Sequence, residues 1–122
     1  MKRPGARADT LAALRDAVRD FAVERDWARF HTPKNLAMAL AGEAGEVLEV
    51  LQWLTPEESA ALDAAGREAL ALELADVLLY LVRLADVSGI DLGAACERKL
   101  AINAERYPVD KARGRATKYD RL

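Results

Sequence analysis

Two pairs of acidic residues stand at helical spacing in stretches that are otherwise rich in apolar residues. Glu43 and Glu46 are three residues apart, and Glu73 and Asp76 repeat that spacing further along the chain. Residues three apart are neighbours on a helix surface, so each helix would present two carboxylates at the edge of an apolar stripe. Burying an ionised carboxylate without a partner costs several kcal/mol. These acids therefore require a base, a cation or water as their partner.

A divalent cation is one candidate partner, and a solvated edge is the alternative. Lys34 and Arg83 are the only bases in residues 33–54 and 68–87, so pairing within the helices is limited. Ligands that are all oxygen favour Mg²⁺ or Mn²⁺, and Ca²⁺ after them. Di-iron bundles use Glu-x-x-His pairs, whereas the single histidine, His31, lies outside both stretches, and a zinc site would need a Cys/His cluster. Spacing alone leaves open whether the acids bind metal or face water and lysines.

The elements that must position these acids are helices. The chain has 122 residues, 52% of them hydrophobic, with only 4 Pro and 7 Gly, which is typical of one folded helical domain. Apolar residues recur every three to four positions, and start and stop signals divide the chain. The pattern predicts an all-α fold, an antiparallel four-helix bundle with a short connector helix. The expected helices cover residues 9–26, 33–54, 56–66 (the connector), 67–87 and 91–106.

Charge and composition suggest the rest of the organisation. We expect a flexible segment at residues 1–8, a helical domain at 9–108 and a basic tail at 109–122, without regular structure. Residues 98–122 hold 8 Lys/Arg and 3 Asp/Glu, whereas residues 1–97 hold 10 and 17, which suggests an anion-binding segment beside a cation-binding body. The chain lacks a long apolar run and a secretory signal, and its one cysteine cannot form an internal disulfide. We therefore expect a cytoplasmic protein.

The ordered segments resemble the MazG-like all-α nucleoside triphosphate pyrophosphohydrolases. The family pattern is E-E-x-x-E, a spacer and then E-x-x-D, and here Gly42 stands in place of the first Glu, as is usual in the dCTP pyrophosphatase branch. The resemblance covers about residues 10 to 120. It rests on the two acid pairs and on the segments ERDWARFHTPKNLAMALAGEAGEVLEVLQW, ELADVLLYLVRLAD, KLAINAERYP and KARGRATKY.

This resemblance implies a MazG-like fold and a role for particular residues. It assigns the metal ligands as Glu43, Glu46, Glu73 and Asp76, with Mg²⁺ as the ion and Mn²⁺ as its substitute, and it makes Glu43 and Glu46 the candidates for the catalytic base. Glu49 continues the spacing but has no counterpart at Leu79, so we expect it outside the metal site. The implied substrate contacts are Trp27, His31, Trp53, Tyr80, Lys99, Asn103, Arg106, Lys118 and Tyr119.

The expected activity is Mg²⁺-dependent hydrolysis of a (d)NTP to the monophosphate and pyrophosphate. The narrower expectation is a preference for dCTP or modified pyrimidine dNTPs, in sanitation of the nucleotide pool. One alternative is a non-catalytic helical module that binds metal or nucleotide and regulates a partner, and another is a structural helical oligomer with its acids in salt bridges. The expected partner is a nucleoside triphosphate, with neither a nucleic acid polymer nor a membrane. Apolar residues on more than one helical face, together with the resemblance, suggest a homotetramer (a dimer of dimers) or a homodimer.

Overall fold

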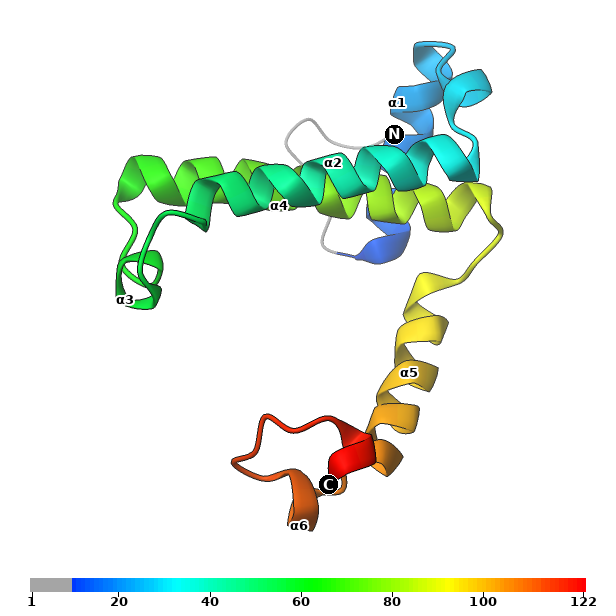
Figure 1. The fold of residues 1–122 in the computed structure, drawn as a ribbon. Coiled ribbons are helices and arrows are strands. Elements are labelled where there is room, and N and C mark those ends of the chain that lie inside the picture. The colour runs from blue at the N-terminus through cyan, green and yellow to red at the C-terminus, as the bar shows by residue number, and fades with distance from the viewer. Residues whose placement is uncertain (1–9) are drawn as a thin grey trace. The chain divides into compact units, whose positions relative to one another are not determined.

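The computed structural model describes residues 10–122, so the predicted flexible segment at residues 1–8 lies outside the described part (Figure 1). Helices account for all the regular structure of this part, and the predicted all-α class with four principal helices and a short connector is confirmed. The elements are α1 (Leu11–Glu24), η1 (Ala28–Phe30), α2 (Pro33–Leu51), α3 (Pro56–Ser59), α4 (Ala64–Val87), α5 (Leu92–Arg106), α6 (Val109–Ala112) and η2 (Tyr119–Arg121).

Polar caps begin the helices at the places that the sequence indicates. The Thr32 side chain accepts a hydrogen bond from the backbone N–H of Asn35, and Pro33 occupies the first turn of α2. Thr55 and Glu58 form a complete capping box at α3, and Asp91 caps α5. After α4, Gly89 takes a φ of +67°, the left-handed conformation that stops a helix at little cost for glycine.

Several predicted boundaries are wrong, and α1 is one case because it ends at Glu24 and not at Asp26. The connector helix ends at Ser59 instead of near Gly66, and α4 begins at Ala64, because the Asp63 side chain accepts a 2.8 Å hydrogen bond from the Gly66 backbone N–H. Gly66 therefore lies in the first turn of α4 and does not end the connector. Helix α2 ends at Leu51 and not at Leu54. The tail, expected to be irregular, contains the short helices α6 and η2.

The described chain forms two compact units, one ending at Ile90 and the other spanning Asp91–Leu122. In the first unit α2 and α4 lie antiparallel and side by side, and α1 packs on α4 (Figure 1). The buried apolar side chains of this unit are Ala22, Leu36, Val82 and Ala85. They come from α1, from the first turn of α2 and from the last turns of α4, so the core lies at the end of the α2–α4 pair where three helices meet.

The second unit contains α5, α6 and η2. Its aromatic contact joins Tyr107 and Tyr119, whose ring centroids are 6.0 Å apart in an edge-to-face arrangement. The predicted helical domain at 9–108 and basic tail at 109–122 stay predictions. Among residues 10–122, no helix combines the length and the apolar character that crossing a membrane requires.

Candidate metal centre and adjoining pocket

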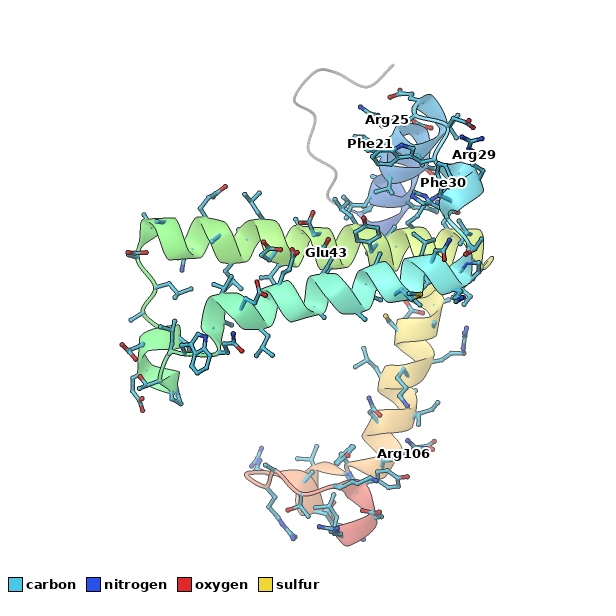
Figure 2. The ribbon with its side chains drawn as sticks, turned by 45° about the horizontal axis from the view of Figure 1, so that its top comes forward. Phe21, Arg25, Arg29, Phe30, Glu43 and Arg106 are labelled. Carbon is cyan, nitrogen blue, oxygen red and sulfur yellow. The ribbon has the colours of Figure 1, made fainter. Side chains whose placement is uncertain are left out.

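The four predicted acids come together between α2 and α4. Glu43 and Glu46 lie on α2, Glu73 and Asp76 lie on α4, and one carboxylate oxygen from each lies within 4.8 Å of the others. Figure 2 labels Glu43 between the two helices. The antiparallel pairing of the two helices brings the i, i+3 pair of one against the i, i+3 pair of the other. Residues that are about 30 positions apart in the sequence thus form one carboxylate cluster.

The electrostatics of this cluster are unfavourable for four free carboxylates. Glu43 Oε2 and Glu73 Oε2 are buried and have no hydrogen-bond partner. The hydrogen bond with the Glu46 carboxyl, burial, and the negative charges of Glu46, Asp76 and Glu73 raise the pKa of Glu43 to about 7. The pKa of Glu73 is also raised, by its hydrogen bond with Glu46 first and then by burial and the neighbouring charges.

A divalent cation fits this donor set. Within residues 10–122, the ion pairs between bases and acids include none of the four cluster carboxylates, so no described lysine or arginine neutralises them. The two buried oxygens without partners need a positive group that the described chain does not supply. Oxygen-only ligands suit Mg²⁺ and Mn²⁺, which bind carboxylates in the ionised form.

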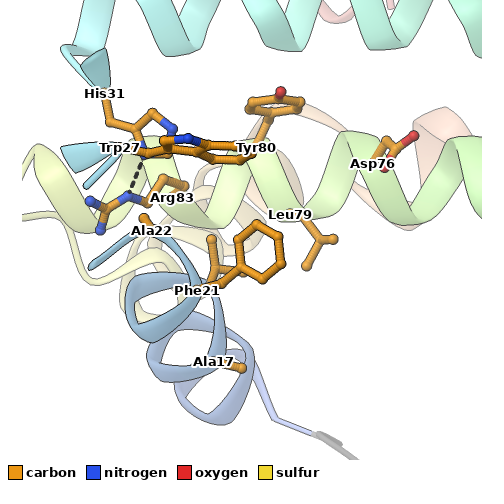
Figure 3. Close-up of a pocket in the computed structure, with 10 residues that line it drawn as sticks. Ala17, Phe21, Ala22, Trp27, His31, Asp76, Leu79, Tyr80 and Arg83 are labelled. Atoms are coloured by element: carbon orange, nitrogen blue, oxygen red, sulfur yellow. Dashed lines mark hydrogen bonds between the residues drawn. The ribbon is translucent and has the colours of Figure 1, made fainter. Parts of the chain in front are cut away.

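A pocket of about 390 Å³ lies beside the cluster, in the same compact unit (Figure 3). Of the predicted substrate contacts, Trp27, His31 and Tyr80 line it, and Asp76 belongs both to the pocket and to the cluster. The complete lining is Ala17, Val18, Phe21, Ala22, Trp27, His31, Asp76, Leu79, Tyr80 and Arg83. The pocket is therefore mostly apolar, with a few polar groups on its wall and a metal-ligand candidate at one side.

An aromatic group forms part of the pocket wall. The Phe21 and Trp27 rings meet edge to face with centroids 5.6 Å apart, and Trp27 meets His31 at 6.4 Å. Trp27 remains 45% exposed and Phe21 47% exposed, so both rings keep surface that a flat ligand can contact. Such rings suit stacking on a nucleobase.

The sequence predicts six further substrate contacts. Trp53 follows α2 and is 87% exposed. The other five belong to the second unit, where the Arg106 guanidinium lies 4.6 Å from the Tyr119 ring centroid and the Lys118 ammonium 5.9 Å from it. The roles of these residues stay predictions, and the five are Lys99, Asn103, Arg106, Lys118 and Tyr119.

Sequence reasoning missed one polar residue of the pocket, Arg83. Its guanidinium Nε donates a 3.0 Å hydrogen bond to His31 Nδ1, and its Nη1 contacts Asp86 at 3.2 Å. The available signal was the spacing of Asp76, Tyr80 and Arg83, at i, i+4 and i+7, which places all three on one face of α4. The partner that completes the network, Arg19 of α1, is 67 positions from Asp86 and carries no local signal.

Comparison with known proteins gives a consistent result. A family model described as the MazG-like family matches residues 39–122. The proteins named dCTP pyrophosphatase 1 from Homo sapiens and Bos taurus are 46% identical to this chain over 115 residues, which cover 93% of this chain and 68% of theirs. The crystal structure of a pyrophosphatase from Archaeoglobus fulgidus matches with a TM-score of 0.76 and 34% identity, over 87% of this chain and 99% of that one.

Proposed function

Because the chain belongs to the MazG-like family and is a nucleoside triphosphate pyrophosphohydrolase like its dCTP pyrophosphatase relatives, we propose that it hydrolyses deoxynucleoside triphosphates, with dCTP or modified pyrimidine dNTPs preferred. Water attacks the α-phosphorus, the bond to the β-phosphate breaks, and the products are the monophosphate and pyrophosphate. The observation that carries the proposal is the carboxylate cluster, four ligand oxygens within 4.8 Å of one another beside an apolar pocket.

The cluster residues would hold a divalent cation, Mg²⁺ first and Mn²⁺ as a substitute. The four ligands are Glu43, Glu46, Glu73 and Asp76. Without a cation, a site with four carboxylates would repel a triphosphate. When bound, the ion supplies positive charge for the phosphate oxygens and lowers the pKa of water. The support comes from the unpartnered buried oxygens of Glu43 and Glu73, which a cation would neutralise.

A carboxylate of the Glu43–Glu46 pair accepts the proton of the attacking water in this proposal. In the metal-free protein the hydrogen bond with Glu46, burial and the cluster's negative charges raise the pKa of Glu43 to about 7. A bound cation would lower this pKa and keep the carboxylate ionised, which is the form that accepts a proton. Glu46, the more exposed member of the pair, is the alternative acceptor. The pair holds the proton between two oxygens until it leaves to solvent.

The base of the nucleotide occupies the pocket. Trp27 offers ring surface for stacking, whereas the Arg25 guanidinium covers one face of Phe21 at 3.5 Å from its centroid. His31 and Tyr80 add polar atoms to the wall. Trp53 and the second unit supply further contacts in this proposal. Lys99, Asn103 and Arg106 are spaced i, i+4 and i+7 on α5, and their basic members suit phosphates. Lys118 and Tyr119 complete the proposed set of contacts.

We also propose that the enzyme is a cytoplasmic homotetramer or homodimer that removes unwanted dNTPs from the nucleotide pool. Large apolar side chains of α2 and α4 remain more than half exposed in the single chain, among them Met38, Leu48, Leu72 and Leu74. Contact with a second copy would cover them. Light scattering coupled to size-exclusion chromatography tests the assembly, and a monomer at micromolar concentration would contradict it.

The experiment that tests the activity is a pyrophosphate-release assay. It compares the natural dNTPs and NTPs with several modified cytosine and uracil dNTPs, each with Mg²⁺ and with EDTA. We expect turnover of at least one deoxynucleotide with Mg²⁺ and none with EDTA, and equal amounts of monophosphate and pyrophosphate. Absence of turnover on every substrate would refute the proposed function.

A further inference from the structure

Arg83 is a buried arginine on the wall of the pocket, whereas most arginines lie on the protein surface. Arg83 is 6% exposed, and among residues 10–122 it is the charged residue that is buried. The other wall residues with ionisable side chains are Asp76, Tyr80 and His31. A buried arginine is costly unless its donors meet acceptors, so its partners explain why it is there.

Those partners form a chain of contacts from α1 to the pocket. Arg19 of α1 donates two hydrogen bonds to the Asp86 carboxylate, from Nη2 at 2.6 Å and from Nε at 2.9 Å. Asp86 accepts a third, at 3.2 Å, from Arg83 Nη1. Arg83 then donates from Nε to His31 Nδ1 at 3.0 Å, the dashed line in Figure 3. Asp86 thus compensates the charge of Arg83, and Arg19 holds Asp86 from a second helix.

These contacts determine which ring nitrogen of His31 carries a proton. A guanidinium has only donors and does not lose its proton in proteins, so the ring nitrogen that faces it must be the unprotonated acceptor. His31 Nδ1 faces it, and the proton of the neutral ring therefore sits on Nε2. Burial and the positive charge of Arg83 also lower the pKa of His31. Asp76 and Tyr80 are the remaining titratable groups of the wall, and Asp86 and Arg19 stand behind Arg83.

We propose that Arg83 is a positioning residue that fixes His31 as a neutral imidazole with a donor at Nε2, so that the pocket selects a heterocyclic base with a hydrogen-bond acceptor on the edge that meets His31. This rests on the proposed function for the identity of the ligand as a nucleotide. The rest of the wall supports the selection, because Val18, Phe21 and Leu79 offer no polar atoms that could replace a missing donor. A base that presents a donor to His31 would leave two N–H groups facing each other.

The first test needs no substrate, because His31 is the only histidine of the chain. Two-bond ¹H–¹⁵N correlation spectra of the ¹⁵N-labelled protein report the protonation of each ring nitrogen directly. For the unmodified protein at pH 8 we expect a protonated Nε2 and an unprotonated Nδ1, and a titration from pH 8 down to pH 5 should give a midpoint below the usual 6.5. A neutral ring with its proton on Nδ1, or a midpoint at or above 6.5, would overturn the proposal.

Variants separate positioning from general stability. Arg83→Met keeps most of the side-chain volume and removes the donor, so the His31 midpoint should move up toward 6.5 and the two tautomers should mix. Arg67→Met, the same change at an exposed site in the first turns of α4, is the matched control and should leave the histidine signals unchanged. Unchanged signals in a folded Arg83→Met protein would contradict the proposal. If that variant does not fold, Arg19→Ala loosens the same network from its exposed end, and the titration of the unmodified protein still decides.

Substrate kinetics give the second readout. With the best substrate of the unmodified enzyme, Arg83→Met should raise KM roughly three- to tenfold, the size expected for one neutral hydrogen bond, and leave kcat within about twofold. The ratio of kcat/KM between bases that differ at one acceptor should shrink by a similar factor. An equal loss for every base would indicate a purely structural role and overturn the proposal. An unmodified protein that turns over no nucleotide refutes the proposed function, whereas the histidine spectra decide the role of Arg83 separately.

Discussion

The carboxylate cluster and the pocket both include residues of helix α4, but within residues 10–122 the charges of the cluster are unpaired whereas the buried charge of the pocket is paired. In the cluster, four groups of one sign face each other, and two buried oxygens, on Glu43 and Glu73, have no hydrogen-bond partner. In the pocket, the buried Arg83 meets both an acidic partner, Asp86, and a neutral acceptor on His31. Asp76 belongs to both regions, so the contrast arises within about two helical turns.

The contrast indicates where each region gets its stability. In the pocket the chain itself supplies a counter-charge, because the Asp86 carboxylate pairs with both Arg19 and Arg83. The cluster lacks counter-charge within the described residues, and its like charges raise the pKa values of Glu43 and Glu73. Adding metal, changing the pH or neutralising an acid should therefore have a large effect on stability and activity through the cluster and a small effect through the pocket. The reverse should hold for substitutions in the network.

The largest expected effect follows neutralisation of a cluster acid. Glu73→Gln removes one ligand and one source of repulsion, so it should lower kcat/KM at least about 100-fold while raising the Tm of the metal-free protein. Pyrophosphate release and thermal unfolding in EDTA measure the two quantities. Glu49→Gln, one turn beyond Glu46 on α2 and outside the cluster, is the control and should stay within about threefold in activity. A Glu73→Gln protein with full activity would remove Glu73 from the metal site.

The second effect breaks the pocket's network. Asp86→Ala leaves Arg83 buried without its counter-charge, and the free energy of unfolding should fall by about 2–4 kcal/mol, measured by urea denaturation. The Asp86 side chain is 12% exposed, so after its removal water has little access to the Arg83 guanidinium. Asp20→Ala, at an exposed acid of α1, is the control and should have little effect. Equal stability of the two variants would mean that the network does not hold the helices together.

The sequence predicts the cluster well because its signals are local. Each acid pair is visible as an i, i+3 spacing on an apolar stripe, and the start signals at Thr32, Thr55 and Asp91 depend on residues within one turn. The error at Gly66 has a local cause too. A glycine near a helix end can stop a helix or occupy the first turn of the next one. Here the hydrogen bond from the Gly66 N–H to the Asp63 side chain places Gly66 in the first turn of α4.

The network around Arg83 could not be predicted in the same way. Its contacts join positions that are 52 and 67 residues apart, so no periodicity in a single helix reveals them. Within the sequence, Arg83 is one base interrupting an apolar run, which is equally compatible with an exposed position. Only the packing of α1 on α4 shows that its side chain is buried and paired.

A third, smaller effect is the pH dependence of the metal-free protein. In the folded state the pKa of Glu43 is about 7, and in the unfolded chain it returns to about 4.5, so between these values the folded state binds more protons. Stability in EDTA should therefore fall as pH rises from about 4.5 to about 7. Thermal unfolding across this range should show the loss, and Glu43→Gln should reduce it. A Tm that rises through this interval in EDTA would contradict the assigned direction.

The smallest effect concerns the exposed end of the network. Arg19→Ala should lower the Tm by less than Asp86→Ala does, because Asp86 keeps its contact with Arg83. Added salt should narrow the difference between Arg19→Ala and the unmodified protein, since the Arg19 side chain is 47% exposed. Arg15→Ala is the control on the same helix, where the ion pair joins only the adjacent Asp16. A larger loss for Arg19→Ala than for Asp86→Ala would reverse the assigned order of importance.

Calorimetric titration of the metal-free protein with Mn²⁺ tests most directly whether the carboxylate cluster binds a divalent cation. At pH 8 we predict saturable binding by the unmodified protein, at least tenfold weaker binding by Glu43→Gln, and an affinity of Glu49→Gln within about threefold of the unmodified protein. At pH 5.5 the unmodified protein should bind more weakly, because Glu43, with its pKa raised to about 7, is then protonated. No binding by the unmodified protein, or equal affinity in Glu43→Gln, would contradict the assignment of this cluster as the metal centre.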